Sequence, residues 1–350
     1  MVTSSISNIQ YPPSRFAIIG FGNIGTRHAK HIVNHPDAEL VAVCDIDESK
    51  LQHELIEANK DILLCSDYRL LLQQTNIDVV NVCTPNYLHH PMTIEALKAG
   101  KHVVCEKPMA MSSLQCREMI EAAEQNDRQL FVVKQNRYNP PVKAVKELIE
   151  AGQLGQVFQV SINCFWNRNA NYYLNSTWRG KKDLDGGCLF TQCSHFVDIL
   201  YYLVGDVEAV SGIVHNFNHQ DLAEFEDAGT FLLKGKNGAL INFNFSNCSY
   251  EQNMEGSITI LAEKGTVKIG GQYLNTIDYQ NIEGFKIPDL PQGNGANDYV
   301  GGYKGSMSNH DKVIENVVDT LQGRAEIATN GENGRKVVEI IEAMYESCHA

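Results

Sequence analysis

Short apolar runs alternate with segments of helical spacing along the first third of the chain. Polar residues that favour helix N-termini precede several of the helical segments, among them Asp47, Ser66 and Ser112. The apolar runs occupy residues 16–19, 40–44, 62–65, 79–83, 103–105 and 130–133. Repeated alternation of strands and helices is typical of a parallel, doubly wound sheet with helices on both faces. We therefore predict an α/β fold whose first domain spans residues 1–135.

The pattern changes to β-rich segments after about residue 150. These segments cover 157–165, 207–214, 230–233, 239–245 and 257–261, with a helix near 195–203 and closing helices at about 310–321 and 331–347. Turn residues at 236–238 and 264–265 are typical of hairpins, so we predict a large open, mainly antiparallel sheet in a second α+β domain, residues 136–350. The Gly- and Asn-rich stretch 270–305 predicts a long excursion, an active-site flap.

A large sheet covered by helices on one face leaves its other face open. Apolar residues there favour burial against a second copy of the chain. We expect a homodimer or homotetramer that forms through the open face.

The first strand runs into a glycine turn of the form G-x-G-x-x-G. Gly20 allows the tight turn, Gly22 lets the backbone approach a pyrophosphate, and Gly25 lets helix and strand pack closely. Asn23 and Ile24 begin a helix whose free N–H groups and dipole attract phosphate. The motif alone is also compatible with an ordinary glycine turn.

The end of the second strand supports a dinucleotide site. Asp45 stands where a carboxylate accepts hydrogen bonds from a ribose diol. The next residues, Ile46 and Asp47, supply no cation for a 2′-phosphate. The sequence therefore favours NAD over NADP.

Composition excludes several classes of function. The net charge of −13, with 29 basic residues in 350, argues against nucleic-acid binding. None of the 10 cysteines forms a C-x-x-C pair or lies at zinc-finger spacing from histidine, so we predict no metal site and a reducing compartment. The N-terminus lacks the pattern of a signal peptide, and no apolar run approaches the roughly 18–20 residues of a membrane span. We expect a soluble, cytoplasmic protein without membrane partners.

Two further strand ends carry motifs. Thr84-Pro85-Asn86 with His89 follows the fourth strand, and Glu106-Lys107-Pro108 follows the fifth. Together with the glycine turn, these motifs resemble the Gfo/Idh/MocA family of NAD(P)-dependent oxidoreductases, which share T-P-x-x-x-H and E-K-P at these places. The resemblance covers essentially the whole chain. It implies that the cofactor contacts also include Thr84, Pro85, Asn86, His89, Glu106, Lys107 and Gln135.

Lys107 is the first candidate catalytic residue. A lysine at the carboxyl end of a parallel strand lies beside the cofactor, where its ammonium can stabilise a substrate alkoxide. The alternative is a solvated surface lysine. Glu106 either orients Lys107, contacts the nicotinamide side or is a buried partner.

His195 is the second candidate catalytic residue. Gly186-Gly187 followed by His195 and Asp198 resembles the family element G-G-G-x₇-H-x-x-D, in which the histidine acts as acid or base. The alternative is a core histidine on an amphipathic helix. The sequence departs from the element at two places: Cys188 replaces the third glycine, and Thr191 stands where many sugar dehydrogenases carry aspartate. A threonine cannot act as a carboxylate base, which leaves Lys107 and His195 as the working pair.

The runs W-N-R, Y-Y, W-R-G and D-G-G between residues 166 and 187 resemble the UDP-N-acetylglucosaminuronate 3-dehydrogenases of polysaccharide and O-antigen pathways. This resemblance implies oxidation of the C3 hydroxyl of UDP-N-acetylglucosaminuronic acid (UDP-GlcNAcA), whose diphosphate and carboxylate suit arginine. We expect Arg179 at the carboxylate and Arg168 at the phosphates, although each candidate arginine could instead be a structural ion-pair partner. The expected substrate contacts are Lys107, Arg137, Arg168, Tyr172, Trp178, Arg179, Thr191, Gln192 and His195.

Two other functions stay open on the sequence. The same fold could oxidise a free sugar, an inositol or a glucoside, because fold does not fix function. A non-catalytic NAD-binding sensor is the third possibility. The presence of both Lys107 and His195 favours an enzyme.

Overall fold

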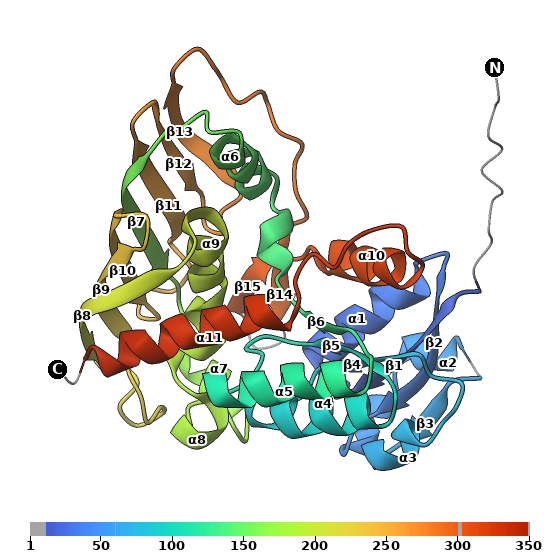
Figure 1. Ribbon diagram of the computed structural model, residues 1–350. Coiled ribbons are helices and arrows are strands. Elements are labelled where there is room, and N and C mark those ends of the chain that lie inside the picture. Colours follow the sequence, from blue (N-terminus) through green and yellow to red (C-terminus); the bar gives the residue numbers. More distant parts are fainter. Residues whose placement is uncertain (1–11, 60, 300–302, 349–350) are drawn as a thin grey trace, which may run out of the picture.

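The computed structural model describes residues 12–59, 61–299 and 303–348 (Figure 1). The N-terminal segment on which the expectation about targeting rests lies outside these ranges, as do residues 300–302 of the predicted flap. Within the described ranges, no helix has the length and apolar character needed to cross a membrane.

The first domain contains the predicted parallel sheet, with strand order β3-β2-β1-β4-β5-β6. Every neighbouring pair is parallel. The strands are β1 (Ser14–Ile19), β2 (Ala38–Cys44), β3 (Leu63–Cys65), β4 (Val79–Val82), β5 (His102–Cys105) and β6 (Leu130–Val132). The strand order reverses between β1 and β4, and ligands of such sheets bind outside the carboxyl ends at that point.

Helices cover both faces of this sheet because its strands are apolar on both sides (Figure 1). Phe16 and Ile18 pack with α1 and α10, whereas Ala17 and Ile19 share a core with α4 and α5. The helices of this domain are α1 (Asn23–Val33), α2 (Glu54–Glu57), α3 (Tyr68–Leu72), α4 (His89–Lys98) and α5 (Ser113–Gln125). The described chain thus confirms the doubly wound arrangement.

Two local predictions in this domain were wrong. Asp67, not Ser66, caps α3 by accepting a hydrogen bond from the backbone N–H of Arg69. The helix predicted after Asp47 is interrupted: a 3-10 turn ends at Leu51, and α2 begins at Glu54. The second start arises because His53 caps α2 through its own side chain, 3.2 Å from the N–H of Leu55.

The second domain contains a seven-stranded sheet with the order β13-β12-β11-β7-β10-β9-β8. Its strands are β7 (Val157–Phe165), β8 (Val207–His215), β9 (Ala228–Gly235), β10 (Leu240–Ser246), β11 (Glu255–Ala262), β12 (Gly265–Gly270) and β13 (Thr276–Ile282). One pair, β7 and β10, is parallel and the other neighbouring pairs are antiparallel, which confirms the predicted, mainly antiparallel sheet. The parallel pair arises because β7, first in the chain, lies between β11 and β10.

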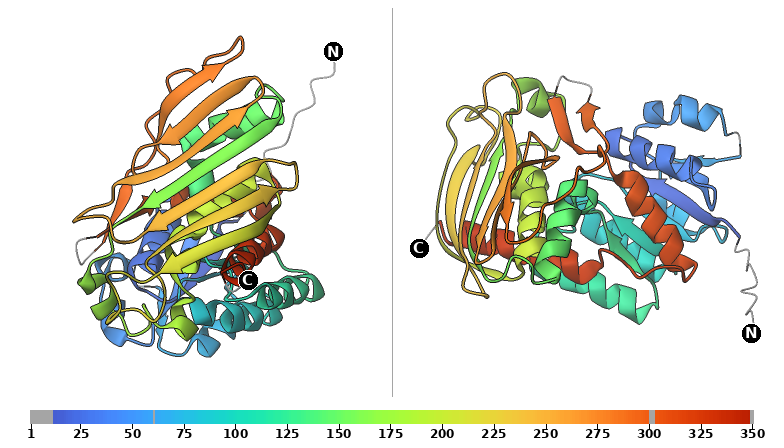
Figure 2. Two further views of the ribbon diagram at one scale, coloured as in Figure 1. Left: turned by 90° about the vertical axis from the view of Figure 1, so that its left-hand side faces the viewer. Right: turned by 90° about the horizontal axis from the view of Figure 1, so that it is seen from above.

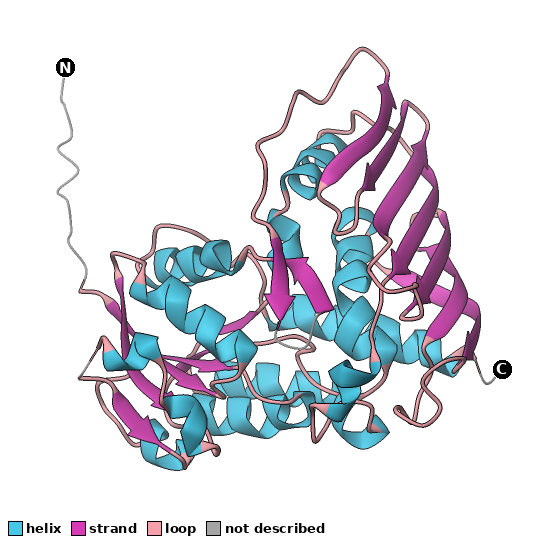
Figure 3. Cartoon of the chain, turned by 180° about the vertical axis from the view of Figure 1, so that it is seen from behind, coloured by secondary structure: helices cyan, strands magenta, loops and turns pink. Residues whose placement is uncertain are grey.

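The predicted excursion at 270–305 also holds regular structure. It contains β13 and part of a hairpin formed by β14 (Ala296–Tyr299) and β15 (Tyr303–Met307), which lies between the two domains (Figure 3). The hairpin brings Ser306, at its end, close to the cavity described below.

The remaining helices follow β6 in the chain. They are α6 (Pro140–Glu150), α7 (Ala170–Leu174), α8 (Lys182–Asp185), α9 (Ser194–Val204), α10 (His310–Leu321) and α11 (Gly331–Glu346). α9 packs against the inner face of the second sheet, and α11 runs from that sheet to α5. No helix covers the outer face of this sheet in the described part of the chain (Figure 2).

Candidate active site

A cavity of about 970 Å³ lies between the carboxyl ends of the first sheet and the loops of the second domain. It brings together most of the residues predicted from the sequence. Those that line it are Gly20, Gly22, Asn23, Ile24, Asp45, Thr84, Pro85, Asn86, His89, Glu106, Lys107, Gln135, Arg168, Tyr172, Trp178, Arg179, Thr191, Gln192 and His195. Gly25 and Arg137 are absent from the lining.

The glycine turn fits a pyrophosphate. Gly20 has a φ of +91°, and a Cβ there would lie 2.7 Å from the carbonyl oxygen of Cys83. A Cβ on Gly25 would lie 2.0 Å from the carbonyl oxygen of Gly20, so Gly25 serves the packing of strand and helix. A Cβ on Gly22 would meet nothing within 4 Å. The open space beside Gly22, at the start of α1, is where a phosphate can approach the helix N-terminus.

Asp45 lies at the end of β2 and lines the same cavity. Its carboxylate accepts hydrogen bonds from the backbone N–H groups of Phe21, at 2.7 Å, and Asp47, at 2.9 Å. Lys50 Nζ lies 3.3 Å from Asp45 Oδ1 and also lines the cavity. A cation is therefore present near the predicted ribose site. The prediction from the sequence considered only Ile46 and Asp47 there and did not identify it.

The Thr84–His89 segment links neighbouring loops. The His89 ring lies between the carbonyl oxygens of Thr84, at 2.8 Å, and Pro108, at 2.7 Å, so it links these two loops at the edge of the cavity, and its contact with the cofactor stays a prediction. Asn86 donates to the second domain, as described below. Two buried polar atoms of the lining, Thr84 Oγ1 and Gln135 Oε1, have no hydrogen-bond partner among the described residues. Since such atoms are costly when unsatisfied, they fit a bound ligand with polar groups, as a nicotinamide carboxamide has.

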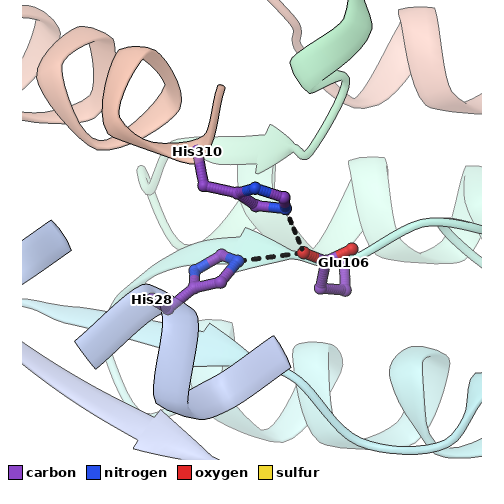
Figure 4. A group of neighbouring side chains, drawn as sticks. All are labelled: His28, Glu106 and His310. Atoms are coloured by element: carbon purple, nitrogen blue, oxygen red, sulfur yellow. Dashed lines mark hydrogen bonds and ion pairs between the residues drawn. The ribbon is translucent and has the colours of Figure 1, made fainter. Parts of the chain in front are cut away.

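Glu106 lies between two buried histidines (Figure 4). His28 Nε2 is 2.9 Å and His310 Nε2 is 3.6 Å from Glu106 Oε1, and Glu106 Oε2 accepts from the N–H of Lys107 at 3.1 Å. Burial acts to raise the pKa of Glu106, but the bonds from the histidines outweigh it and hold that pKa well below its usual range. His28 Nδ1 also accepts from Asn81, at 2.7 Å, so both nitrogens of His28 are used in hydrogen bonds. This arrangement supports an ionised carboxylate directly behind Lys107.

Lys107 is half-buried in the cavity wall, and its Nζ donates to the carbonyl oxygen of Thr191 at 2.9 Å. Burial lowers the pKa of Lys107 to about 8, although the neighbouring Glu106 carboxylate acts in the opposite direction. The side chain therefore titrates close to neutral pH, which distinguishes it from a solvated surface lysine.

His195 lies at the start of α9, directly after a π-helical turn formed by Leu189–Cys193. Such turns occur frequently at functional sites. Its Nε2 is 3.4 Å from Ser306 Oγ, which accepts from Gln135 Nε2 at 2.9 Å. Burial, followed by the charge of Lys107, holds the pKa of His195 well below its ordinary value. The ring is therefore neutral at pH 7 and able to accept a proton.

Arginines stack on aromatic rings along the wall formed by the second domain. The guanidinium carbons of Arg168 and Arg179 lie 5.4 and 4.3 Å from the ring centroid of Tyr172. Arg168 Nε donates to Gln192 Oε1 at 2.7 Å, and Gln192 in turn contacts the Tyr172 hydroxyl. Trp178 lies beside Arg179, 5.6 Å from its guanidinium carbon. These contacts place two cations in one wall of the cavity.

Arg137 occupies a different place from the other predicted arginines. Its Nε and Nη2 bind the two oxygens of Asp198 at 3.0 and 2.7 Å, and its guanidinium lies over the ring of Tyr202. The residue is 7% exposed and contributes nothing to the cavity lining. The structure therefore supports the ion-pair alternative for Arg137 rather than the predicted substrate contact.

The sequence reasoning missed three residues of this region. Asp185 was noted only as part of a D-G-G run, yet its buried carboxylate accepts from the hydroxyl of Thr191. The signal that could have identified it is an aspartate six residues before Thr191, which offers a carboxylate near the expected reaction centre. Ser306 and His310 belong to no motif that the sequence shows. The hairpin and α10 bring them to the cavity from the far end of the chain.

The comparisons with known proteins agree with this geometry. Residues 14–134 match the NAD-binding Rossmann-fold domain of the GFO_IDH_MocA oxidoreductase family, and residues 146–350 match its C-terminal alpha/beta domain. The chain belongs to this oxidoreductase family. It is an enzyme of the NAD-dependent dehydrogenase type, with NAD as the cofactor of its first domain.

Several family members with known names are similar over most of their length. D-glucoside 3-dehydrogenase of Escherichia coli is 27% identical over 96% of this chain and 95% of its own. Among solved structures, the WlbA dehydrogenase of Bordetella pertussis, in complex with NADH and UDP-GlcNAcA, is 36% identical, with a TM-score of 0.85 and coverage of 96% of this chain and 97% of that one. The WlbA dehydrogenase of Chromobacterium violaceum, with the same two ligands, is 35% identical at the same TM-score, covering 97% of this chain and 96% of that one.

Proposed function

We propose that this chain catalyses the NAD-dependent oxidation of the C3 hydroxyl of UDP-GlcNAcA to a ketone. The observation that carries the proposal is one cavity whose lining includes Lys107 and His195 together with the glycine turn, Arg168 and Arg179. The similarity to two WlbA dehydrogenases crystallised with NADH and UDP-GlcNAcA supports the same ligand pair.

The proposed chemistry divides two protein roles between Lys107 and His195. When bound, NAD⁺ supplies a hydride acceptor. His195, neutral at pH 7, accepts the proton of the C3 hydroxyl, and the Lys107 ammonium stabilises the alkoxide that results. Loss of hydride from C3 of the alkoxide then gives the ketone.

The two arginines serve the anionic parts of the substrate in this proposal. Arg179 binds the uronic acid carboxylate, and Arg168 faces the diphosphate. Tyr172 supports both, because each guanidinium stacks on its ring. In a protein of net charge −13, such a local cluster of cations is required to hold a multiply charged anion.

The biological setting belongs to the same proposal. A 3-keto nucleotide sugar is suited to transamination, which places the reaction in polysaccharide or O-antigen biosynthesis in the cytoplasm. The open face of the second sheet forms the interface of a homodimer or homotetramer. Its support is that Leu232 and Leu240 lie exposed on that face, beside a hydrogen-bonded chain from Thr230 through Asn244 to Asn163.

Turnover measurements across a matched set of sugars test this function. UDP-GlcNAcA should be preferred to UDP-N-acetylglucosamine by at least about 2 kcal/mol in kcat/KM, because the second sugar has an uncharged hydroxymethyl group at C6 and leaves the guanidinium of Arg179 without its carboxylate. Arg179→Ala should erase most of that preference while NADH binding, followed by fluorescence, stays intact. A preference that survives the substitution removes Arg179 from the proposal. Faster turnover of free sugars, inositols or glucosides would move the function to the neutral-sugar alternative, and no turnover with tight NADH binding would favour a sensor.

A further inference from the structure

A buried carboxylate lies behind the contact between Lys107 and the second domain. Asp185, at the end of α8, is 1% exposed. Its Oδ1 accepts from the hydroxyl of Thr191, and its Oδ2 accepts from the N–H of Gly180 at 2.8 Å. Asn86 donates to both the carbonyl oxygen of Asp185 and the hydroxyl of Thr191, each at 2.8 Å. Asp185 thus joins the first domain, the π-helical turn and the loop that carries Arg179.

The other side of this junction is the ammonium of Lys107. Its acceptor is the main-chain oxygen of Thr191, the same residue whose hydroxyl is bound to Asp185. The position of that oxygen therefore depends on how the π-helical turn is held. Because Asp185 and Asn86 are the residues that hold the Thr191 side chain, they fix the point to which Lys107 is anchored.

The charges around Lys107 come from both domains. Glu106 and Asp185 favour its charged form, whereas Lys134 and Arg168 oppose it. Burial raises the pKa of Asp185 above its usual value, while the hydrogen bonds from Thr191 and Gly180 and the charges of Arg179 and Lys107 act in the opposite direction. Of the two carboxylates that favour the charged lysine, Asp185 is the one supplied by the second domain.

We propose that Asp185 is a positioning residue for Lys107. Its carboxylate keeps Lys107 charged from the side of the second domain, and its bond to Thr191 fixes the acceptor of the ammonium. The inference rests on the proposed role of Lys107 in the reaction. Asp185 supplies from another position the negative charge that the threonine at 191 cannot provide.

The first test measures the pKa of Lys107 without any substrate. Competitive acetylation of the whole enzyme by acetic anhydride, with the Lys107 peptide quantified by mass spectrometry from pH 6 to 10, reports that pKa directly. In Asp185→Asn it should fall by about one unit, since the loss of a nearby negative charge favours the neutral amine. Asp183→Asn, on the exposed side of the same helix, is the matched control and should leave the value unchanged. The proposal is overturned if the pKa of Lys107 in Asp185→Asn lies within about 0.3 unit of the wild-type value. An equal fall of that pKa in the Asp183→Asn control overturns it as well.

A second variant separates charge from folding. Asn at 185 has one acceptor oxygen in place of two, so it cannot accept from both the hydroxyl of Thr191 and the N–H of Gly180, and some local loosening is expected. The double variant Asp185→Asn/Thr191→Asp restores a carboxylate near Lys107 from the neighbouring position. It should raise the pKa of Lys107 back toward the wild-type value. If the pKa of Lys107 in the double variant stays as low as in the single variant, structural damage accounts for the shift and the proposal is wrong.

The pH profile of turnover connects the inference to catalysis. With UDP-GlcNAcA, kcat/KM should fall as the pH rises through the pKa of Lys107, because the ammonium is lost. In Asp185→Asn this alkaline limb should move to lower pH by the shift measured through acetylation. A limb that stays in place contradicts the proposal. A wild-type enzyme that oxidises no UDP-sugar, but shows the acetylation shift, would refute the proposed function and leave the role of Asp185 intact.

Discussion

The two walls of the cavity are built in different ways. On the wall of the first domain, the glycine turn and Asp45 lie at the ends of adjacent parallel strands, and their roles follow from backbone geometry within a few residues. On the opposite wall, the contacts join distant parts of the chain: Lys107 reaches Thr191, 84 residues away, and Asn86 reaches it from 105 residues away. The first wall is a binding surface in its own right. The second acquires its chemistry only when the two domains meet.

The largest expected effect comes from the residue that joins the two walls. Lys107→Met should reduce kcat by on the order of 100-fold or more, as for other losses of groups that assist proton transfer and alkoxide formation. NADH affinity should change little, because the pyrophosphate is held by backbone N–H groups at the glycine turn. Steady-state kinetics with a fluorescence titration of NADH check both statements. Near-normal turnover in this variant would remove Lys107 from the proposed mechanism.

The glycine turn offers a matched pair of substitutions within the first wall. Gly22→Ala adds a methyl group where the protein leaves open space, so the melting temperature should hold while NADH affinity falls about tenfold or more. Gly25→Ala places a Cβ 2.0 Å from the carbonyl oxygen of Gly20, so the fold itself should lose about 1–3 kcal/mol. Thermal melts beside NADH titrations separate the two effects. Equal melting temperatures for both variants would contradict the different tasks assigned to the two glycines.

The smallest expected effect concerns the choice between cofactors. Asp45 accepts from ribose hydroxyls and repels a 2′-phosphate, so NAD should bind at least about tenfold more tightly than NADP. Lys50, 3.3 Å from Asp45, provides a sharper comparison. Lys50→Met should weaken NADP binding further and leave NAD binding nearly unchanged, because only NADP carries the additional phosphate. Equal dissociation constants for the two cofactors in the wild type would refute the assignment of Asp45.

The sequence predicted the first domain well because its signals are local. Apolar runs of strand length, each followed by a capped amphipathic segment, specify the parallel sheet whatever the rest of the chain does. The errors concern helix starts, where a competing side-chain hydrogen bond sets the first residue of the helix. His53, for example, caps a new helix with its own side chain. In the second domain the strand segments were largely found, yet the parallel pairing of β7 with β10 depends on insertion of β7 into the middle of the sheet. No periodicity within either strand encodes that neighbour.

By itself the sequence determined the residue types at the strand ends and the chemistry that they make possible, from the glycine turn to the lysine of E-K-P. Only the tertiary structure decided which of the predicted arginines face the cavity: Arg168 and Arg179 line it, whereas Arg137 is held by Asp198. The same holds for Asp185, whose carboxylate gains its role because the π-helical turn brings Thr191 between it and Lys107. A side chain's partners across domains are set by packing over long sequence separations, which local pattern does not record.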